Sequence, residues 1–307
     1  MIVVRDASKL EGKPLVATIG FFDGVHIGHR FLIGEMNRIA KENGLSSAVI
    51  TFPEHPRAVL QADYQPQLLN SFEEKIVRLA TTEVDYCVVM DFNKQLSQLS
   101  AHTFIHDILA GRLHVNTLLI GYDHRFGHNR AEGFEDYVRY GQECGMKVIQ
   151  APSYLENGQA ISSSWIRKRI LAGDMSEAAR LLTYPYMLNG HIVKGHQVGR
   201  TIGFPTANIQ IDEPAKIIPA TGVYAVRVHL QKKVFKGMLY IGNRPTVDNG
   251  DEVSVEVNIL DFEGDLYNRN IRIAFVSHVR DNIRFDSLDD LRAQLEKDRQ
   301  TVLNILA

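Results

Sequence analysis

A glycine-rich segment with two histidines, Gly20-Phe-Phe-Asp-Gly-Val-His-Ile-Gly-His29, carries the residue types best suited to chemistry on phosphate groups. It joins an apolar, strand-like run to an amphipathic, helix-like run, and ligands of parallel α/β sheets bind where such strands end. Its glycines let the backbone approach a ligand, and the start of the helix offers free N–H groups to an anion. His26 and His29 are three residues apart, so both can face one way and donate hydrogen bonds to phosphate oxygens. A glycine turn with two capping or surface histidines is the alternative interpretation.

A second segment, Ile161-Ser-Ser-Ser-Trp-Ile-Arg167, opens another helix with three hydroxyls and places a guanidinium one turn later. Hydroxyl and backbone N–H groups at a helix start suit a triphosphate, and Arg167 adds positive charge with a fixed fork of donors. Alone, such a serine-rich start is usually only a helix cap. Together with the glycine segment, it predicts a nucleotide-binding site.

In a third segment, Gly190–Asn208, three glycines, Gly195, Gly199 and Gly203, punctuate a loop that could fold over phosphates. It is not a Walker P-loop. Arg200 stands where a lysine is required, the glycine spacing is one residue short, and Pro205 occupies the start of the required helix. The final Pro-Thr-Ala-Asn of the segment, taken alone, is typical of a simple turn.

A carboxylate on a predicted strand is a candidate for acid–base chemistry. In Val255–Leu260, Glu256 and Asn258 alternate with apolar residues, so their side chains share one face of the strand. A solvated face of a sheet is the simpler explanation of that carboxylate.

The first half of the chain alternates strand-like and helix-like runs, which predicts a parallel sheet covered by helices on both faces, a Rossmann-like α/β domain. The strand-like runs are Leu15–Gly20, Ser47–Phe52, Tyr86–Asp91, Thr117–Gly121 and Lys147–Gln150. The helix-like runs are His29–Asn43, Phe72–Ala80, Ala101–Leu109 and Gly133–Cys144, followed by Ser164–Leu171 and Met175–Leu182.

From about residue 186 the pattern changes to strand-like runs without helices between them, which predicts an antiparallel barrel or sandwich. These runs are Gly222–Leu230, Val234–Ile241, Val253–Leu260 and Ile271–Ser277. One helix closes the chain, with Ser287 as N-cap and an apolar stripe of Leu288, Leu291, Leu295, Val302 and Ile305. We expect domains at 1–183 and 184–307.

The composition indicates an ordinary globular protein of 307 residues with a formal net charge of −2. Without a basic face, nucleic acid is an unfavourable partner. Cys87 and Cys144 are the only cysteines, which favours a reducing compartment over a disulfide framework. We find no signal peptide and no apolar run of membrane-spanning length, so we expect a soluble, cytoplasmic protein.

The first two segments resemble the adenylyltransferase half of bacterial bifunctional FAD synthetases, the riboflavin kinase/FMN adenylyltransferase family. Thr51–Pro56 and Gly121–Gly127 are similar to two further blocks of that family. The resemblance implies catalytic roles for His26, His29 and Arg167. It also implies ATP binding by Gly20, Phe21, Ser163 and Ser164, and flavin binding by Pro56, Asp123 and Phe126. The chain departs from the family pattern at His124, where Phe is common, and at Ser164, where Thr is common.

The third segment resembles the riboflavin kinase signature, which ends in the same Pro-Thr-Ala-Asn. The resemblance implies ATP binding by Gly195, Gly199, Arg200 and Gly203, and Mg²⁺ ligation by Thr206 and Asn208. It places the general base at Glu256. Arg280 resembles a family position that contacts flavin or phosphate, with a surface arginine as the alternative. Asn258 stands where the family often has His.

The resemblance spans nearly the whole chain and implies two reactions: ATP phosphorylates riboflavin to FMN, and a second ATP then donates AMP to FMN, giving FAD and pyrophosphate. Mg²⁺ is the implied cofactor, and the expected partners are small molecules, with no nucleic acid or membrane and a monomer or weak homo-oligomer. Two alternatives remain. One half could have lost its activity, or the chain could bind nucleic acid, because the His-x-Gly-His pattern also resembles a motif of tRNA synthetases.

Overall fold

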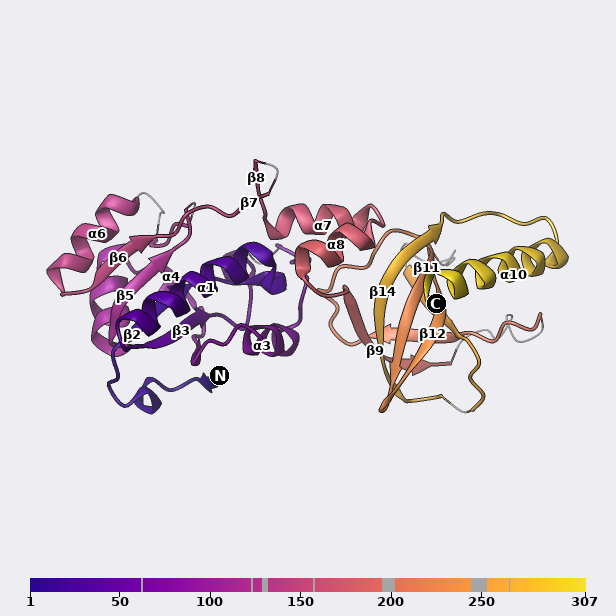
Figure 1. The fold of residues 1–307 in the computed structure, drawn as a ribbon, viewed down its shortest axis with the longest axis horizontal. Helices are drawn as coiled ribbons and strands as arrows, with labels where there is room; N and C mark the ends of the chain where they lie inside the picture. Colours follow the sequence, from indigo (N-terminus) through magenta and orange to yellow (C-terminus); the bar gives the residue numbers. More distant parts are fainter. Residues whose placement is uncertain are drawn as a thin grey trace. The chain divides into compact units, whose positions relative to one another are not determined.

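The computed structural model describes the chain as two compact units, Met1–Ser163 and Ser164–Ala307, and each is considered by itself (Figure 1). The described residues are 1–61, 63–122, 124–128, 132–156, 158–194, 202–243, 253–264 and 266–307. The helices α7 (Ser163–Leu171) and α8 (Met175–Leu182) belong to the second unit, except for Ser163, the first residue of α7. The expected functional boundary at 183/184 therefore stays a prediction.

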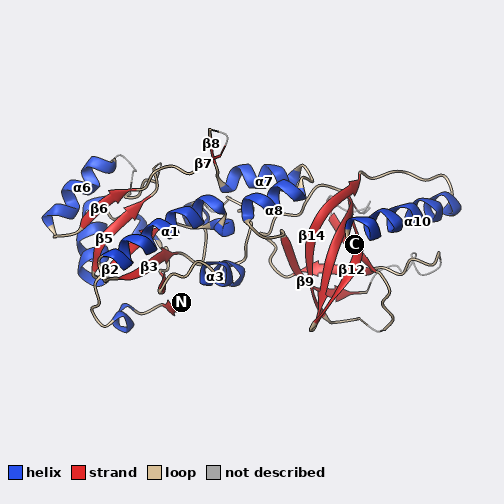
Figure 2. Cartoon of the chain, viewed as in Figure 1, coloured by secondary structure: helices blue, strands red, loops and turns tan. Residues whose placement is uncertain are grey.

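The first unit is built on a six-stranded parallel sheet, which confirms the predicted class (Figure 2). Its strands are β1 (Ile2–Val4), β2 (Leu15–Ile19), β3 (Ser46–Thr51), β4 (Tyr86–Val89), β5 (Val115–Ile120) and β6 (Lys147–Gln150). Their order across the sheet is β1-β4-β3-β2-β5-β6. The chain runs from β2 outward through β3 and β4, then returns to place β5 on the other side of β2. The carboxyl ends of β2 and β5 thus lie at the switch point where such sheets bind ligands.

Helices cover both faces of this sheet, so its strands are apolar on both sides. Alternate strand residues feed two separate clusters: Ala17 and Ile50 enter one, Val16 and Val49 the other. The helices α1 (Ile27–Glu42) and α3 (Phe72–Ala80) pack against the second cluster. The π-helix η3 (Phe104–Arg112), which continues the single turn α5 (Ala101–Thr103), and α6 (Phe134–Glu143) pack against the first. Two buried faces explain why these strands read as continuous apolar runs.

The second unit contains a closed antiparallel barrel, which decides between the two architectures that the sequence left open. The strands follow one another around it as β10-β13-β12-β11-β14-β9. Their bounds are β9 (Met187–Val193), β10 (Ala207–Ile211), β11 (Gly222–Leu230), β12 (Lys233–Asn243), β13 (Val253–Ile259) and β14 (Asn270–Arg280). The β11–β12 and β11–β14 pairs are long antiparallel pairs of this barrel.

Several short elements were not predicted. The strand β1 has three residues and pairs only with β4 among the described strands. The strands β9 and β10 border the glycine loop, and their Asn, Gly and His residues weaken the alternating pattern. A hairpin of β7 (Leu155–Glu156) and β8 (Gln159–Ala160) precedes α7.

The closing helix α10 (Leu288–Ile305) begins as predicted, because the Ser287 hydroxyl accepts a hydrogen bond from the Asp290 N–H. The predicted apolar stripe is wrong at both ends: the side chains of Leu288 and Ile305 are exposed. Val302 and Leu306 are buried against the barrel, with Leu295 packed beside them. The stripe is shorter than predicted because the packed residues run from Leu295 to Leu306.

A buried charge in the middle of α10 joins this helix to β14. Asp298 is 2% exposed, and both its carboxylate oxygens accept hydrogen bonds from Arg280, at 2.7–3.0 Å. Gln294 donates a further hydrogen bond to the same carboxylate. The Arg280 guanidinium also donates a hydrogen bond to the Asp281 carbonyl. Most of its N–H donors are therefore used in hydrogen bonds within the protein.

Removing one member of this pair should destabilise the second unit strongly. We expect Asp298→Ala to lower the free energy of unfolding by about 3–5 kcal/mol, because an arginine is left facing a buried void without its counter-charge. Urea unfolding followed by circular dichroism measures this. Glu296→Gln is the matched control on the same helix: it removes an exposed ion pair with Arg299 and should cost under about 1 kcal/mol. Equal costs for the two variants would contradict the prediction.

Candidate functional site

The turn after β2 holds an unusual backbone path. Phe22, Gly24 and Val25 all have positive φ angles, of 55°, 82° and 38°. Residues other than glycine rarely adopt such angles. The buried Asp23 carboxylate stabilises this path by accepting hydrogen bonds from the Leu69 and Asn70 N–H groups at 3.0–3.1 Å. A strained turn fixed by buried contacts is the usual setting of a ligand site.

The two histidines of the turn lie face to face. Helix α1 starts at Ile27, and His26 is its N-cap, with Nδ1 accepting from the His29 N–H at 3.4 Å. The rings stack with centroids 3.6 Å apart, and Phe22 packs edge-on against His29 at 5.1 Å. The expectation that both histidines face one way is confirmed. His26 is also the N-cap of α1, so the same residue both caps the helix and stacks on His29.

The environment of His29 keeps its imidazole neutral near pH 7. Burial, then the neighbouring His26 and Lys75, hold the pKa of His29 well below its ordinary value of 6.5. Its Nδ1 is buried and has no hydrogen-bond partner among the described residues. An anion placed at this ring would supply the missing partner and raise the pKa.

A buried lysine beneath the turn was not predicted. Lys75 of α3 is 2% exposed, and its ammonium donates to the backbone carbonyls of Phe21, at 3.0 Å, and Phe52, at 2.7 Å. Nζ also lies 3.9 Å from the centre of the Phe21 ring. Burial lowers the pKa of Lys75 from 10.5 to about 8, although the Asp23 carboxylate opposes the shift. The sequence carried a signal: Lys75 occupies a core position of α3, three residues after Phe72 and four before Leu79.

The serine segment begins at the same turn. The Ser163 hydroxyl donates to the Asp23 carbonyl at 2.9 Å, so the first unit brings this residue to the histidine pair. A side chain at Gly28 would lie 3.3 Å from the His26 ring and 3.6 Å from the Ile161 carbonyl, which explains glycine there. Ser164 and Arg167 lie in α7, in the second unit, and their expected roles stay predictions.

An aromatic cavity of about 580 Å³ opens at the carboxyl ends of the strands. Its apolar walls include Phe21, Phe52, Phe92, Phe104 and Phe126; its polar lining includes Arg57, Gln61, His124 and His128. Pro56, the first residue of the short helix α2 (Pro56–Leu60), lines it as well. The expected flavin residues Pro56 and Phe126 are thus brought together, while Asp123 lies outside the described residues. Gly20 and Phe21, expected at the ATP site, also line this cavity.

Tyr137, which was not predicted, holds the cavity-lining residue Phe126 in place. Its hydroxyl accepts from the Phe126 N–H and lies 3.0 Å from the Phe126 carbonyl and 3.2 Å from that of Glu132. The two rings stack with centroids 4.3 Å apart. Burial raises the pKa of Tyr137, so the hydroxyl stays protonated as this network requires.

The second unit brings Thr206 and Glu256 together. The Thr206 hydroxyl donates to the Glu256 carboxylate at 3.1 Å, and Asn208 is the cross-strand partner of Glu256 in the β10–β13 pair. Asn258 donates to the Pro205 carbonyl at 2.7 Å, which ties the Pro-Thr-Ala-Asn turn to β13. Thr206 and Asn208 also line a cavity of about 510 Å³.

Tyr240, which was not predicted, lies beside the candidate base. It is the cross-strand partner of Glu256, and burial, with the Glu256 charge, raises the pKa of its hydroxyl. The other predicted residues of this unit lie elsewhere or are not described. Arg280 donates to Asp298, as described above. Gly203 is exposed with φ of 86°. Gly195, Gly199 and Arg200 lie outside the described residues.

Each unit thus holds a candidate site whose residue types suit a transferase that acts on phosphate groups. The FAD synthetase family profile matches residues 8–165, and the riboflavin kinase profile matches residues 182–306. A bifunctional riboflavin kinase/FMN adenylyltransferase of Escherichia coli K12 is 36% identical over 97% of this chain and 95% of its own. That of Listeria monocytogenes is 37% identical over 93% and 90%. The chain belongs to the family of bifunctional riboflavin kinase/FMN adenylyltransferases.

One solved structure shares the whole architecture. The crystal structure of a protein from Streptococcus pneumoniae named as a macrolide-efflux protein is 31% identical and gives a TM-score of 0.88, covering 99% of this chain and 98% of its own. In the part of this chain that the structure describes, no helix combines the length and the apolar character needed to cross a membrane.

The charge on Lys75 should hold the turn in place for adenylyl transfer. We expect Lys75→Met to lower kcat/KM for FMN adenylylation by about 100-fold, because small displacements at a reacting centre have effects of that size. In the wild type this activity should fall as the pH rises through about 8, where Lys75 loses its proton. Lys75→Arg, which stays charged, should move that fall to higher pH.

The stability effect of Lys75 has the opposite sign. Its folded pKa of about 8 lies below the ordinary value of 10.5, so the unfolded chain binds more protons between these values. Its contribution to stability therefore rises as the pH rises through that window.

For the activity prediction, riboflavin phosphorylation is the internal control and should be unchanged in Lys75→Met and Lys75→Arg. An unchanged pH profile in Lys75→Arg would rule out the role of its charge.

Loss of the Tyr137 hydroxyl should loosen the cavity wall. We expect Tyr137→Phe to raise the KM for FMN with little change in kcat, and to cost about 1–3 kcal/mol of stability, because buried backbone groups lose their partner. Steady-state adenylylation kinetics measure the first effect. Tyr140→Phe, on the same helix but outside the cavity lining, is the matched control. An unaltered KM in Tyr137→Phe would contradict the positioning role.

Proposed function

We propose that the barrel unit phosphorylates the 5′-hydroxyl of riboflavin and that the histidine site of the first unit then transfers AMP from ATP to the FMN formed. The resulting division of the chain falls at residue 183/184, as the sequence predicts. Two observations carry this assignment: the stacked His26 and His29 at the start of α1, and the hydrogen bond between Thr206 and Glu256.

In the kinase step, Glu256 acts as the general base. It takes the proton of the riboflavin 5′-hydroxyl, the oxygen attacks the γ-phosphorus of ATP, and ADP leaves. The Thr206 hydroxyl, 3.1 Å away, orients one oxygen of the carboxylate and leaves the other available. The cavity beside Thr206 has the volume of a small-molecule site and includes Phe262 and Tyr267 in its lining.

Thr206 and Asn208 are proposed to hold Mg²⁺. The hydroxyl and amide oxygens of these residues form the hard donor set that Mg²⁺ prefers. Thr206, just before β10, bonds to the Glu256 carboxylate, and Asn208 of β10 is the cross-strand partner of Glu256. When bound, Mg²⁺ neutralises charge on the phosphates of ATP. The loop glycines Gly195, Gly199 and Gly203, with Arg200, are proposed to bind the same phosphates.

In the adenylyl step, an ionised phosphate oxygen of FMN attacks the α-phosphorus of ATP, and the bond to pyrophosphate breaks. No protein nucleophile is needed, so the side chains align the phosphates and stabilise the added negative charge. His29 suits this role because its Nδ1 is buried without a partner and its pKa rises when an anion approaches. Ser163, Ser164 and Arg167 are proposed to bind the triphosphate.

The aromatic cavity of the first unit is proposed to hold the flavin ring of FMN. Its walls are largely aromatic, and its volume of about 580 Å³ suits a planar ligand of that size. Pro56 and Phe126 line it, and Asp123 belongs to the same sequence block. Gly20 also lines the cavity, and the chain runs from there into the turn that holds the two histidines.

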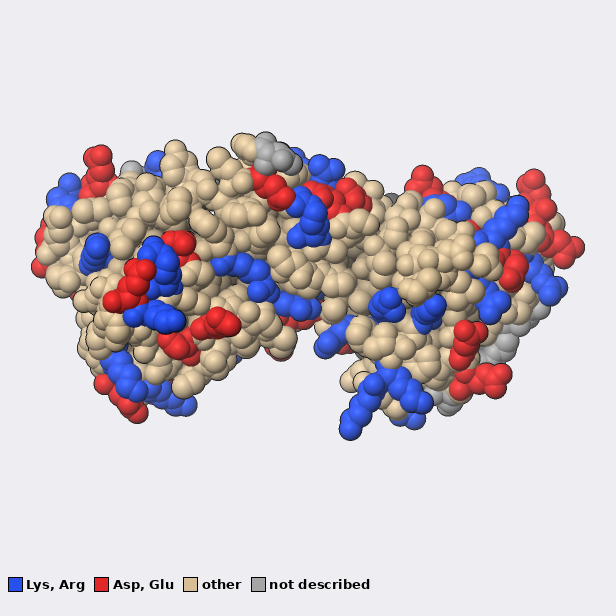
Figure 3. Space-filling view, viewed as in Figure 1, with Lys and Arg blue, Asp and Glu red and all other residues tan. Residues whose placement is uncertain are grey.

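The charge distribution agrees with small-molecule substrates. On the face shown in Figure 3, acidic and basic side chains are interspersed over both units. Nucleic-acid binding would favour a continuous basic surface. A cytoplasmic location and a monomer or weak homo-oligomer remain part of the proposal.

A one-tube assay with two variants tests the assignment. Purified protein is incubated with riboflavin, ATP and Mg²⁺, and flavins are followed by chromatography. We expect FMN to rise first and FAD to follow. Glu256→Ala should abolish FMN formation but convert added FMN to FAD, whereas His29→Ala should accumulate FMN. If either substitution removed both activities in a folded protein, the proposed division between the units would be wrong.

A further inference from the structure

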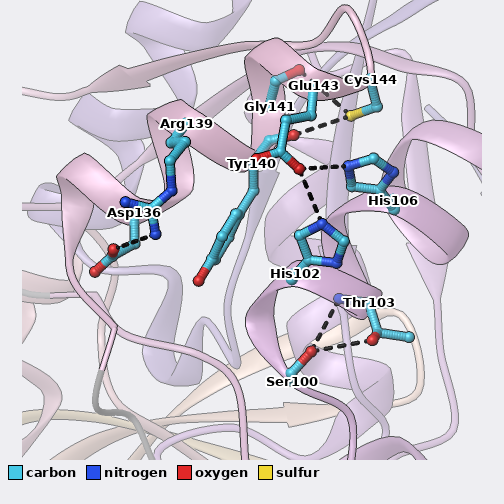
Figure 4. A network of polar contacts seen from close by, with 10 residues as sticks. All are labelled: Ser100, His102, Thr103, His106, Asp136, Arg139, Tyr140, Gly141, Glu143 and Cys144. Atoms are coloured by element: carbon cyan, nitrogen blue, oxygen red, sulfur yellow. Dashed lines mark hydrogen bonds and ion pairs between the residues drawn. The ribbon is translucent and has the colours of Figure 1, made fainter.

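Two histidines and a glutamate meet on the surface of the first unit, and none of the three lines the aromatic cavity. His102 of α5 and His106 of η3 are four residues apart on one continuous helical segment, and Glu143 ends α6 (Figure 4). We call these three residues the His–His–Glu cluster. Both imidazoles point toward the same carboxylate oxygen, with Nε2 of His102 at 3.0 Å and Nε2 of His106 at 3.5 Å.

The distances in the cluster fit a tetrahedral metal ion. Donor atoms bound to zinc at ~2.0–2.2 Å lie ~3.3–3.6 Å apart when the geometry is tetrahedral. The distance of 3.5 Å from His106 to Glu143 falls in this range, the distance of 3.0 Å from His102 is somewhat shorter, and all three donor atoms lie within 4.8 Å of one another. Small side-chain rotations therefore suffice to close the set around one ion.

The packing of the two rings supports a built site over an accidental contact. The imidazoles stack at 4.4 Å with planes 21° apart, and Tyr140 packs edge-on against His102 at 4.9 Å. Nε2 of His106 is buried and makes no hydrogen bond within the described part of the chain. Helix α5 is itself fixed, because the Ser100 hydroxyl caps its first turn at the Thr103 N–H.

We propose that the His–His–Glu cluster binds one divalent transition-metal ion, with zinc as the preferred ion. Two imidazoles and a carboxylate form a donor set that zinc accepts with three protein ligands and one water. The side chains are 46%, 29% and 45% exposed, so the ion has an open route from solvent. Because the ligands come from the continuous segment of α5 and η3 and from α6, the bound ion joins the helices that cover one face of the sheet. This ion is separate from the Mg²⁺ of the two reactions.

Calorimetric titration of the metal-free full chain with zinc sulfate in phosphate-free buffer tests the proposal. We expect one equivalent to bind with the affinity falling at acidic pH, because imidazole must be deprotonated to bind. His102→Ala, His106→Ala and Glu143→Gln should each weaken this binding by at least about 10-fold, the loss that even outer-shell substitutions cause. Cobalt provides a second readout, since tetrahedral Co²⁺ bound to the wild type should absorb visible light strongly and the variants should lose this absorption.

His191→Ala is the matched control. His191 pairs with the Asp212 carboxylate at 3.1 Å and is 40% exposed, but a single histidine with one carboxylate makes a weaker set. This variant should bind zinc as the wild type does. Zinc should also raise the melting temperature of the wild type and of His191→Ala but not of the cluster variants. Wild-type binding that is absent, or unchanged in all three cluster variants, would show that the cluster is only an ion pair.

Discussion

The buried ammonium of Lys75 is the interaction on which the first site depends. It donates to the carbonyls that follow β2 and β3, and so joins the ends of two neighbouring strands to α3. The turn between these strands and α1 contains three positive φ angles and would not keep this path without such support. Burying a cation lowers its pKa, so the contact also carries a cost that well-placed carbonyl oxygens must offset.

The sequence predicted the classes of both domains because hydrophobic periodicity is a local property. The bounds of α3, α8 and β11 matched the structure to the residue, since caps and turn residues mark their ends. Strands β1 and β10 escaped prediction because their identity comes from pairing with distant strands. Burial of α10 was misjudged for a similar reason: periodicity gives the face of a helix but not the length of its contact.

The site residues show the same contrast between signals that are local in the sequence and contacts that depend on distant residues. His26 and His29 were singled out because their spacing within one segment carries a signal, whereas the role of Glu256 was inferred from the resemblance to the riboflavin kinase signature. Lys75 and Tyr137 act from other helices on the backbone of Phe21 and Phe126, and backbone contacts leave no motif. Lys75 shows that a charged residue inside an apolar stripe is itself a usable signal. Tyr137 offers none, because a tyrosine in a core position is ordinary.

The closed barrel and the open sheet differ in one further respect. Each strand of the barrel has two neighbours, so its backbone N–H and C=O groups leave no edge for another chain. The sheet of the first unit ends at β1 and β6, each paired on one side among the described strands, and Ile2 and Val3 of β1 are exposed. Strand addition between molecules can therefore begin in the first unit, and the shortness of these edge strands, with three and four residues, is what limits it.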